Sequence, residues 1–215
     1  MPPLGAGRLG LVAFDLRHGL PLVWREARAR LGAWRALGVL WRLGRPSAAL
    51  GALGPPESAA EAFTRHQLGG RLRLEAAFAP ALGLEPARAA AAELAVAVGA
   101  RFLASRLSLP TRARWAGWSE ERRRVFVAGA LARFQNAEVG AIEVGPDGLA
   151  FDVRRCHFVS LCAALGRPDL LEAFCDADAR FFGDPASPVA LRRPETLATG
   201  GDRCAFRLGY KAPKA

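Results

Sequence analysis

Apolar residues recur at helical spacing over the first two thirds of the chain. Between residues 20 and 43 they are separated by steps of three to seven residues, with arginines in between: Trp24, Leu31, Trp34, Leu37 and Trp41. This period predicts one amphipathic helix over residues 20–43. Residues 1–8 read as a loose, glycine-rich leader, and three prolines in residues 44–56 predict a linker or sharp bend.

Further helices are expected between residues 57 and 134. A short one fits residues 57–67, and two Ala-rich helices fit residues 73–107, with the second starting at Pro86. No titratable cluster accompanies the two Ala-rich helices, so we expect them to form core. Ser119 is a suitable N-cap for the next helix because two glutamates follow it in the first turn.

After Asn136 the helical spacing of apolar residues ends, and apolar residues recur at the shorter spacing typical of a β-strand. Residues 139–144 and 149–153 flank a Pro146-Asp147-Gly148 turn and predict a β-hairpin. Two helices then fit residues 157–165 and 167–182, and two strands fit residues 189–193 and 204–210. The sequence therefore predicts an α+β fold, with N-terminal helices followed by a small antiparallel four-strand sheet with helices inserted between its two hairpins. We expect a basic extension with its linker over residues 1–56 and the α+β domain over residues 57–215.

The basic character of the chain says less about its function than the pI of about 11.0 suggests. The chain has 30 Lys and Arg against 20 Asp and Glu, and almost all of the basic residues are Arg, which indicates a compositional bias. With one Tyr, no Lys cluster and no binding motif, nucleic acid is not an expected partner. The positive charge would assist an anionic substrate or membrane surface.

The basic segment 20–43 has two interpretations. It could contact an anionic membrane or a protein as a Trp-containing amphipathic helix, or pack its Trp face on the domain and leave its arginines in solvent. We favour packing. No secretory signal and no apolar run of the ~18 residues that span a bilayer is evident, so we expect a cytoplasmic protein, membrane-peripheral if residues 20–43 bind lipid.

Candidate chemistry gathers in the last sixty residues. Cys175 and Asp178 are three residues apart on one predicted helix and so share a face. Cys156 ends a strand beside His157, and Cys204 begins the last strand. Three roles stay open for these cysteines: a thiolate nucleophile served by Asp178 or His157, a soft-metal site formed by three thiolates with Asp178 or His157, or ordinary buried thiols. Cys162, inside an apolar helix, is expected to be core.

Electrostatics complicate the nucleophile hypothesis. A carboxylate beside a thiol raises the pKa of that thiol unless a cation or metal compensates. Asp176 and Asp178 follow Cys175 within one helical turn. An Arg or His partner, or zinc or another divalent metal, would therefore have to supply positive charge, and otherwise Cys175 is not the nucleophile.

The C-terminal residues resemble the L-2-amino-thiazoline-4-carboxylic acid hydrolase family over about residues 120–210. The resemblance is carried by separated elements: Cys156-His157-Phe158, Leu165-Gly166, Leu170-Leu171, Phe174-Cys175-Asp176-Ala177-Asp178 and Arg193-x-x-Thr196-Leu197-Ala198-x-Gly200-Gly201-Asp202-x-Cys204-x-Phe206. It implies a bacterial-type hydrolase that opens a thiazoline ring to give N-carbamoyl-L-cysteine.

Carried over by position, the resemblance implies a site made of four residues: Cys175, Asp178, Cys156 and Cys204. Cys175 would be the nucleophile, and Asp178 would act as base or orient the attacking water. Arg193, or His157, would contact the substrate, and Arg193 could pair with a substrate carboxylate. The alternative is an accessory module without catalysis, because the glycine-rich turn and final C-x-F also resemble vinyl-4-reductase-type domains that bind small molecules or metal.

Overall fold

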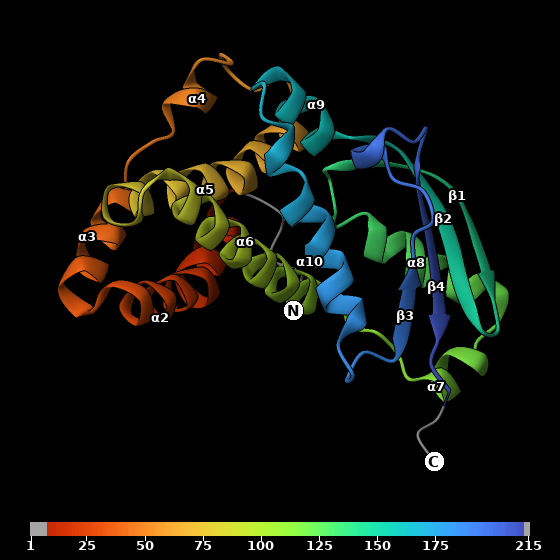
Figure 1. Cartoon of the computed structure of the whole chain (residues 1–215). Coiled ribbons are helices and arrows are strands. Elements are labelled where there is room, and N and C mark those ends of the chain that lie inside the picture. Colours follow the sequence, from red (N-terminus) through yellow and green to blue (C-terminus); the bar gives the residue numbers. More distant parts are fainter. Residues whose placement is uncertain (1–7, 213–215) are drawn as a thin grey trace.

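Helices and sheet form two sides of the molecule, and one helix runs between them. The computed structural model describes residues 8–212. In Figure 1, helices α2, α3, α5 and α6 lie on one side and the four-stranded sheet on the other, while α10 packs on α6 and also contacts strand β3. This arrangement confirms the predicted α+β class. Except for Arg8, the leader expected over residues 1–8 lies outside the described residues.

The helices occupy most of the first 131 residues and the stretch between β2 and β3. A π-helical turn, Asp15–Gly19, joins the first two, and short 3₁₀ turns cover Pro168–Leu170 and Leu197–Thr199. The α-helices are α1 Arg8–Phe14, α2 Leu20–Leu31, α3 Ala33–Leu43, α4 Ala48–Gly51, α5 Ala59–Leu82, α6 Leu84–Arg106, α7 Arg112–Ala116, α8 Glu120–Leu131, α9 His157–Ala164 and α10 Glu172–Gly183.

The sheet is antiparallel throughout, with strand order β1-β2-β4-β3. Its strands are β1 Ala137–Gly145, β2 Gly148–Cys156, β3 Val189–Arg192 and β4 Cys204–Tyr210. The register places Cys204 opposite Val153 and stacks Phe151 against Phe206. As predicted, α9 and α10 are inserted between the two strand pairs. This insertion brings Cys156, at the end of β2, and Cys204, at the start of β4, to the same end of the sheet.

Residues 20–43 differ from the prediction in two ways. They form two helices instead of one, because Gly32 adopts a positive φ of 78° that glycine tolerates and that ends α2. The favoured packing of the Trp face is also wrong for two of the three tryptophans, since Trp34 is 87% and Trp41 is 76% exposed. The small residues of α3 face inward instead, with Ala36 and Val39 fully buried.

The helical side has its own core, to which α2 and α3 contribute together with α5 and α6. Trp24 packs against this core. Helix α5 runs unbroken from Ala59 to Leu82, so the two helices expected over residues 57–67 and from residue 73 are one. Within residues 8–212, no helix is long and apolar enough to cross a membrane.

The close approach of α6 and α10 depends on Gly99. A Cβ atom at this position would lie 2.6 Å from the Cβ of Ala177, which is itself buried. We expect Gly99→Ala to destabilise the protein by about 1–3 kcal/mol, because overpacking forces the helices apart. Urea unfolding measures the loss.

The matched control is Gly129→Ala in α8, where a Cβ meets nothing within 4 Å. The gain in helix propensity should leave the Gly129→Ala protein as stable as the wild type or up to about 1 kcal/mol more stable. Equal stability of both variants would contradict the prediction.

Candidate active site

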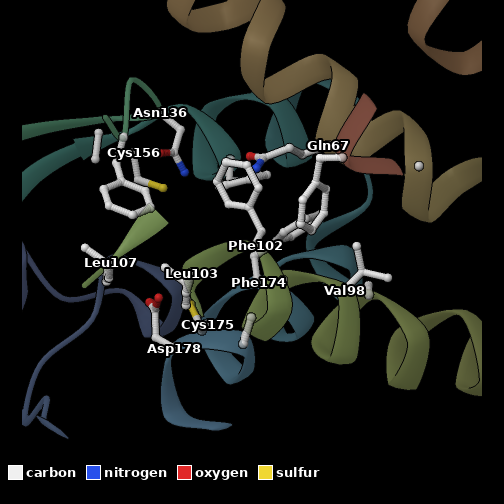
Figure 2. A pocket seen from close by; sticks show the side chains of 18 of the residues that line it. Gln67, Val98, Phe102, Leu103, Leu107, Asn136, Cys156, Phe174, Cys175 and Asp178 are labelled. Atoms are coloured by element: carbon white, nitrogen blue, oxygen red, sulfur yellow. The ribbon is translucent and has the colours of Figure 1, made fainter. Parts of the chain in front are cut away.

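Helix α10 presents Cys175 and Asp178 to a cavity between the helices and the sheet. The two residues are three apart, so their side chains leave the same face of the helix. Both line the cavity, as Figure 2 shows, and Cys156 and Asn136 line it as well. The buried residues Ala173 and Ala177 keep α10 packed on its neighbours, which orients this face toward the cavity.

The cavity has a volume of about 450 Å³, within the range of roughly 300–1,000 Å³ typical of small-molecule sites. Its walls come from the N-terminal helices, α5, α6, α8, α10 and the inner face of the sheet. Most of the lining residues are Leu, Val and Phe. The polar lining is confined to a few places, one of which contains Asp178, Cys175 and Arg193.

Arg193 supplies positive charge to this polar group. Its Nη1 donates a hydrogen bond to Asp178 Oδ2 at 3.0 Å, and its Nη2 donates to the backbone oxygen of Cys175 at 3.1 Å. The guanidinium also lies over the ring of Phe206, 5.3 Å from its centroid. The Arg193 side chain is 12% exposed, so it is part of the site and is not one more solvated arginine. The two hydrogen bonds use two of its five N–H groups.

Asp178 is poised to gain and lose a proton near neutral pH. Burial raises the pKa of this carboxyl to about 6, although the charge and hydrogen bond of Arg193 act in the opposite direction. The 24% exposure of its side chain is compatible with this desolvation, since Asp178 lines the cavity. A carboxyl with such a pKa can serve as a general acid or base.

Two of the thiols in the cavity, those of Cys175 and Cys156, are protonated at neutral pH. Burial raises the pKa of Cys175 to about 11; Arg193 lowers it, while Asp178 raises it further. Burial also raises the pKa of Cys156, which precedes the first residue of α9, and the backbone N–H groups of Val159 and Phe158 only partly offset this. Neither cysteine is therefore a ready thiolate in the protein alone.

Cys175 should accordingly react slowly with iodoacetamide. At pH 7 we expect far slower alkylation than that of a free cysteine, whose pKa is about 8.5, with the rate rising steadily as the pH increases. Peptide mass spectrometry after timed quenching measures the rate at Cys175, and the guanidinium-unfolded protein is the control. Rapid, selective alkylation of native Cys175 at pH 7 would show that another group stabilises its thiolate.

A compact loop sets the positions of Arg193 and Cys204. Thr196 Oγ1 accepts a hydrogen bond from the Thr199 N–H, and Gly200 takes a φ of 86° that favours glycine. A Cβ at Gly201 would lie 2.7 Å from the Cγ of Glu195, so glycine is needed there too. The Leu197 N–H points at Cys204 Sγ, 3.3 Å away. The Thr-Leu-Ala-x-Gly-Gly run is thus a loop motif that supports the site.

The structure brings together five of the six predicted site residues. Cys156, Cys175, Asp178, Arg193 and Cys204 all line the cavity. His157 does not line it; its backbone N–H donates to the backbone oxygen of Asn136 at 2.9 Å. Cys162 is core, as predicted, with 1% exposure.

The part of the chain that the structure describes does not offer the metal ligands that the zinc hypothesis requires. Within residues 8–212, no three His, Cys, Asp or Glu side chains are grouped so that they could hold a metal ion. Thiol ligands would also have to be deprotonated, and burial opposes this at Cys175 and Cys156. The residues therefore do not fit a zinc site, and we assign no step of the reaction to a metal.

A buried charge cluster surrounds Glu75, and it was not evident from the sequence. This carboxylate is paired with Arg167 at 2.9 Å, Arg88 at 3.3 Å and Arg71 at 3.4 Å. The expectation of no titratable cluster in residues 73–107 is therefore wrong. Only the i,i+4 spacing of Arg71 and Glu75 was visible in the sequence, because Arg167 lies 92 residues away from Glu75. The cluster fastens α5 to α6 and to the turn before α10.

Comparison with protein-family models now identifies the family. The model described as L-2-amino-thiazoline-4-carboxylic acid hydrolase matches residues 73–208. The chain belongs to this family. The match confirms the resemblance seen in the C-terminal motifs and extends it upstream into α5. No curated protein and no solved structure matched the chain.

In this member of the thiazoline-carboxylate hydrolase family, the matched region contains all five cavity residues named above. It begins within α5 and ends within β4, so it spans both the helical and the sheet wall of the cavity. Helices α2 and α3 lie outside it.

Proposed function

We propose that this protein is a hydrolase that opens a thiazoline or related carbon–nitrogen centre with water, and that Asp178 is its general base. The observation that carries the proposal is the Asp178–Arg193 pair inside the cavity, with the pKa of the carboxyl at about 6. Family membership supports the reaction class. The raised thiol pKa of Cys175 favours water over this cysteine as the attacking group.

The step balances for the thiazoline that the family is named after. The carboxylate of Asp178 accepts a proton from water as the water oxygen bonds to the ring carbon between nitrogen and sulfur. The double bond from this carbon to the ring nitrogen becomes a single bond, and the nitrogen takes the second proton of the water. The bond from the carbon to sulfur breaks, the sulfur receives the proton held by Asp178 and becomes a thiol, and the carbon becomes a carbonyl. One water is consumed, and the product is N-carbamoyl-cysteine.

Arg193 would orient both reactants. Its two described hydrogen bonds leave three N–H groups, and these can hold a substrate carboxylate. Holding Asp178 at the same time fixes the base relative to the substrate, and such positioning accounts for a large share of a catalytic effect. Cys175 and Cys156 would line the pocket as neutral thiols, and Cys204 would line it beside them.

The experiment is a direct assay with 2-amino-thiazoline-4-carboxylate. We expect a new free thiol, detected colorimetrically, together with a product that mass spectrometry shows to be heavier by one water. Cys175→Ser should retain activity if water is the attacking group. Loss of activity in Cys175→Ser with an intact fold would return the nucleophile role to this cysteine.

A second candidate is a small-molecule-binding module without catalysis, which the size and largely apolar lining of the cavity favour. Native mass spectrometry of the purified protein distinguishes the two. A stoichiometric co-purifying molecule, together with no turnover of thiazoline, amidine or amide substrates, would support the binding module.

A further inference from the structure

The lining of the cavity restricts the ligands that it can hold. Apart from the polar group at Arg193, its walls near α10 are hydrophobic, with Phe102, Phe174, Leu103 and Leu107 in view in Figure 2. A thiazoline that carries only an amino and a carboxylate group has almost no apolar surface to place against them. Hydrophobic walls bind a ligand mainly through the burial of its apolar surface.

A second polar place lies on α5, where Gln67 and Arg71 also line the cavity. They are four residues apart and therefore on one helix face. Gln67 Oε1 and Arg71 Nε are both buried and have no hydrogen-bond partner among residues 8–212. Buried polar atoms are rarely left in this state, and a hydrogen-bond donor on a ligand would satisfy Gln67 Oε1, whereas the guanidinium of Arg71 is held by Glu75 and the backbone oxygen of Arg88.

We infer that the substrate is amphiphilic: an apolar body of several carbons fills the cavity, and its anionic or reacting group lies at Asp178 and Arg193. The inference rests on the proposed function for the location of the reacting group. It narrows the substrate class from a small amino-acid-like thiazoline to a heterocycle or amidine that bears an apolar substituent.

Binding of straight-chain carboxylates tests the apolar body. By isothermal titration calorimetry we expect affinity to rise about threefold to fourfold for each methylene from butanoate toward decanoate, the effect of burying each methylene. Affinity that does not change with chain length in the wild-type protein would overturn the inference.

Two valine variants localise the effect. Val98 lines the cavity, whereas Val125 is 68% exposed on α8 and does not line it. Val98→Phe should fill part of the cavity and lower decanoate affinity at least tenfold, while Val125→Phe should bind as the wild type does. Equal decanoate affinity in the two variants would overturn the inference; if Val98→Phe does not fold, the chain-length series alone decides.

The same probes separate this inference from the proposed function. If decanoate binds as expected but no thiazoline, amidine or amide is turned over, the hydrolase proposal fails and the ligand class stands. If 2-amino-thiazoline-4-carboxylate is turned over and decanoate does not compete with it, the hydrolase proposal stands and the amphiphilic substrate is overturned.

A separate observation concerns the outer face of α3. Trp34, Leu37 and Trp41 lie at i, i+3 and i+7, and they are 87%, 49% and 76% exposed. Large aromatic residues grouped in this way mark an interaction surface. The surface lies outside the family match, so the hydrolase fold itself does not account for it.

The charge around this surface indicates its partner. Residues 20–45 contain six arginines and one glutamate, and Arg25, Arg28, Arg35 and Arg45 are exposed. Of the six, Arg30 is held by Glu26 and Glu93. Exposed tryptophans flanked by arginines match the interface of an anionic bilayer, where indole rings lie at headgroup depth and guanidinium groups pair with phosphates.

We propose that α3 docks on an anionic lipid surface. In a cosedimentation experiment, the wild-type protein should pellet with vesicles of equimolar phosphatidylcholine and phosphatidylglycerol, more weakly with phosphatidylcholine alone, and less as salt increases. The double variant Trp34→Ala/Trp41→Ala should bind at least tenfold more weakly. Because both side chains are exposed, its melting temperature should not change.

The matched control removes exposed apolar side chains elsewhere. Leu84 and Val125 are 51% and 68% exposed, so Leu84→Ala/Val125→Ala should bind vesicles as the wild type does. Absence of wild-type binding to anionic vesicles, or equal loss in the two double variants, would overturn the proposal and leave the surface to a protein partner.

Discussion

Replacing Asp178 by Asn is expected to lower kcat/KM for thiazoline hydrolysis about 10²- to 10⁴-fold, the usual contribution of a positioned general base. The amide keeps the size of the side chain and can still accept a hydrogen bond from Arg193, but it cannot take a proton from water. Steady-state kinetics with the thiol-release assay measures the loss. The effect should fall on kcat, because Arg193 remains available to hold the substrate.

The pH dependence follows from the pKa of about 6 at Asp178. A base must be ionised, so the wild-type kcat/KM should rise with pH and level off above about pH 6, and the residual activity of Asp178→Asn should lack this rise. A wild-type profile that falls through pH 6 would instead make Asp178 a general acid.

Stability supplies an independent readout of the same group. Because the folded-state pKa lies above the ordinary value of 3.8, the folded protein binds a proton that the unfolded chain has lost between about pH 4 and pH 6. As the pH rises from about 4 to about 6, the free energy of unfolding of the wild type should therefore fall by about 3 kcal/mol relative to that of Asp178→Asn, at 1.36 kcal/mol per pKa unit. Parallel urea curves for the two proteins would contradict the assigned pKa.

Replacing Glu75 by Ala is expected to destabilise the protein by about 3–5 kcal/mol, the usual cost of removing one partner from a buried ion pair. The side chain of Glu75 is only 10% exposed, and its loss leaves Arg71 buried without its carboxylate. Arg167 would lose the contact that joins α5 to the turn before α10. Chemical denaturation measures the change.

Glu85 is the matched control on the neighbouring helix. Its side chain is 77% exposed and pairs with Arg88 at 2.8 Å, so Glu85→Ala should cost less than about 1 kcal/mol. The two variants remove the same charge, but Glu75 is buried and paired with three arginines, whereas Glu85 is exposed and paired with one. Burial tends to raise the pKa of Glu75, but the surrounding arginines, Arg167 foremost, outweigh it and hold this pKa below its usual range. The stabilisation by Glu75 should therefore be present at neutral pH and be lost as the pH falls through that lowered pKa. Equal losses in Glu75→Ala and Glu85→Ala would contradict a structural role for the buried cluster.

The sequence determined those features that depend on residues close together in the chain. The alternation around Pro146-Asp147-Gly148 specified the β1–β2 hairpin, and Ser119 caps α8 as its position predicted. The three-residue spacing of Cys175 and Asp178 placed them on one helix face. The order of strands and helices was enough for the fold class, and the C-terminal motifs were enough for the family.

Tertiary structure decided everything that depends on distant partners. Burial raises the pKa of Asp178 to about 6, against the opposing charge and hydrogen bond of Arg193, which lies 15 residues away in the chain. The helical period could not tell which side of residues 33–43 faces the core; packing of small side chains buried Ala36 and Val39 and left Trp34 and Trp41 in solvent. Burial and electrostatic coupling are properties of the assembled chain, and local spacing carries no information about which distant surface will cover a residue.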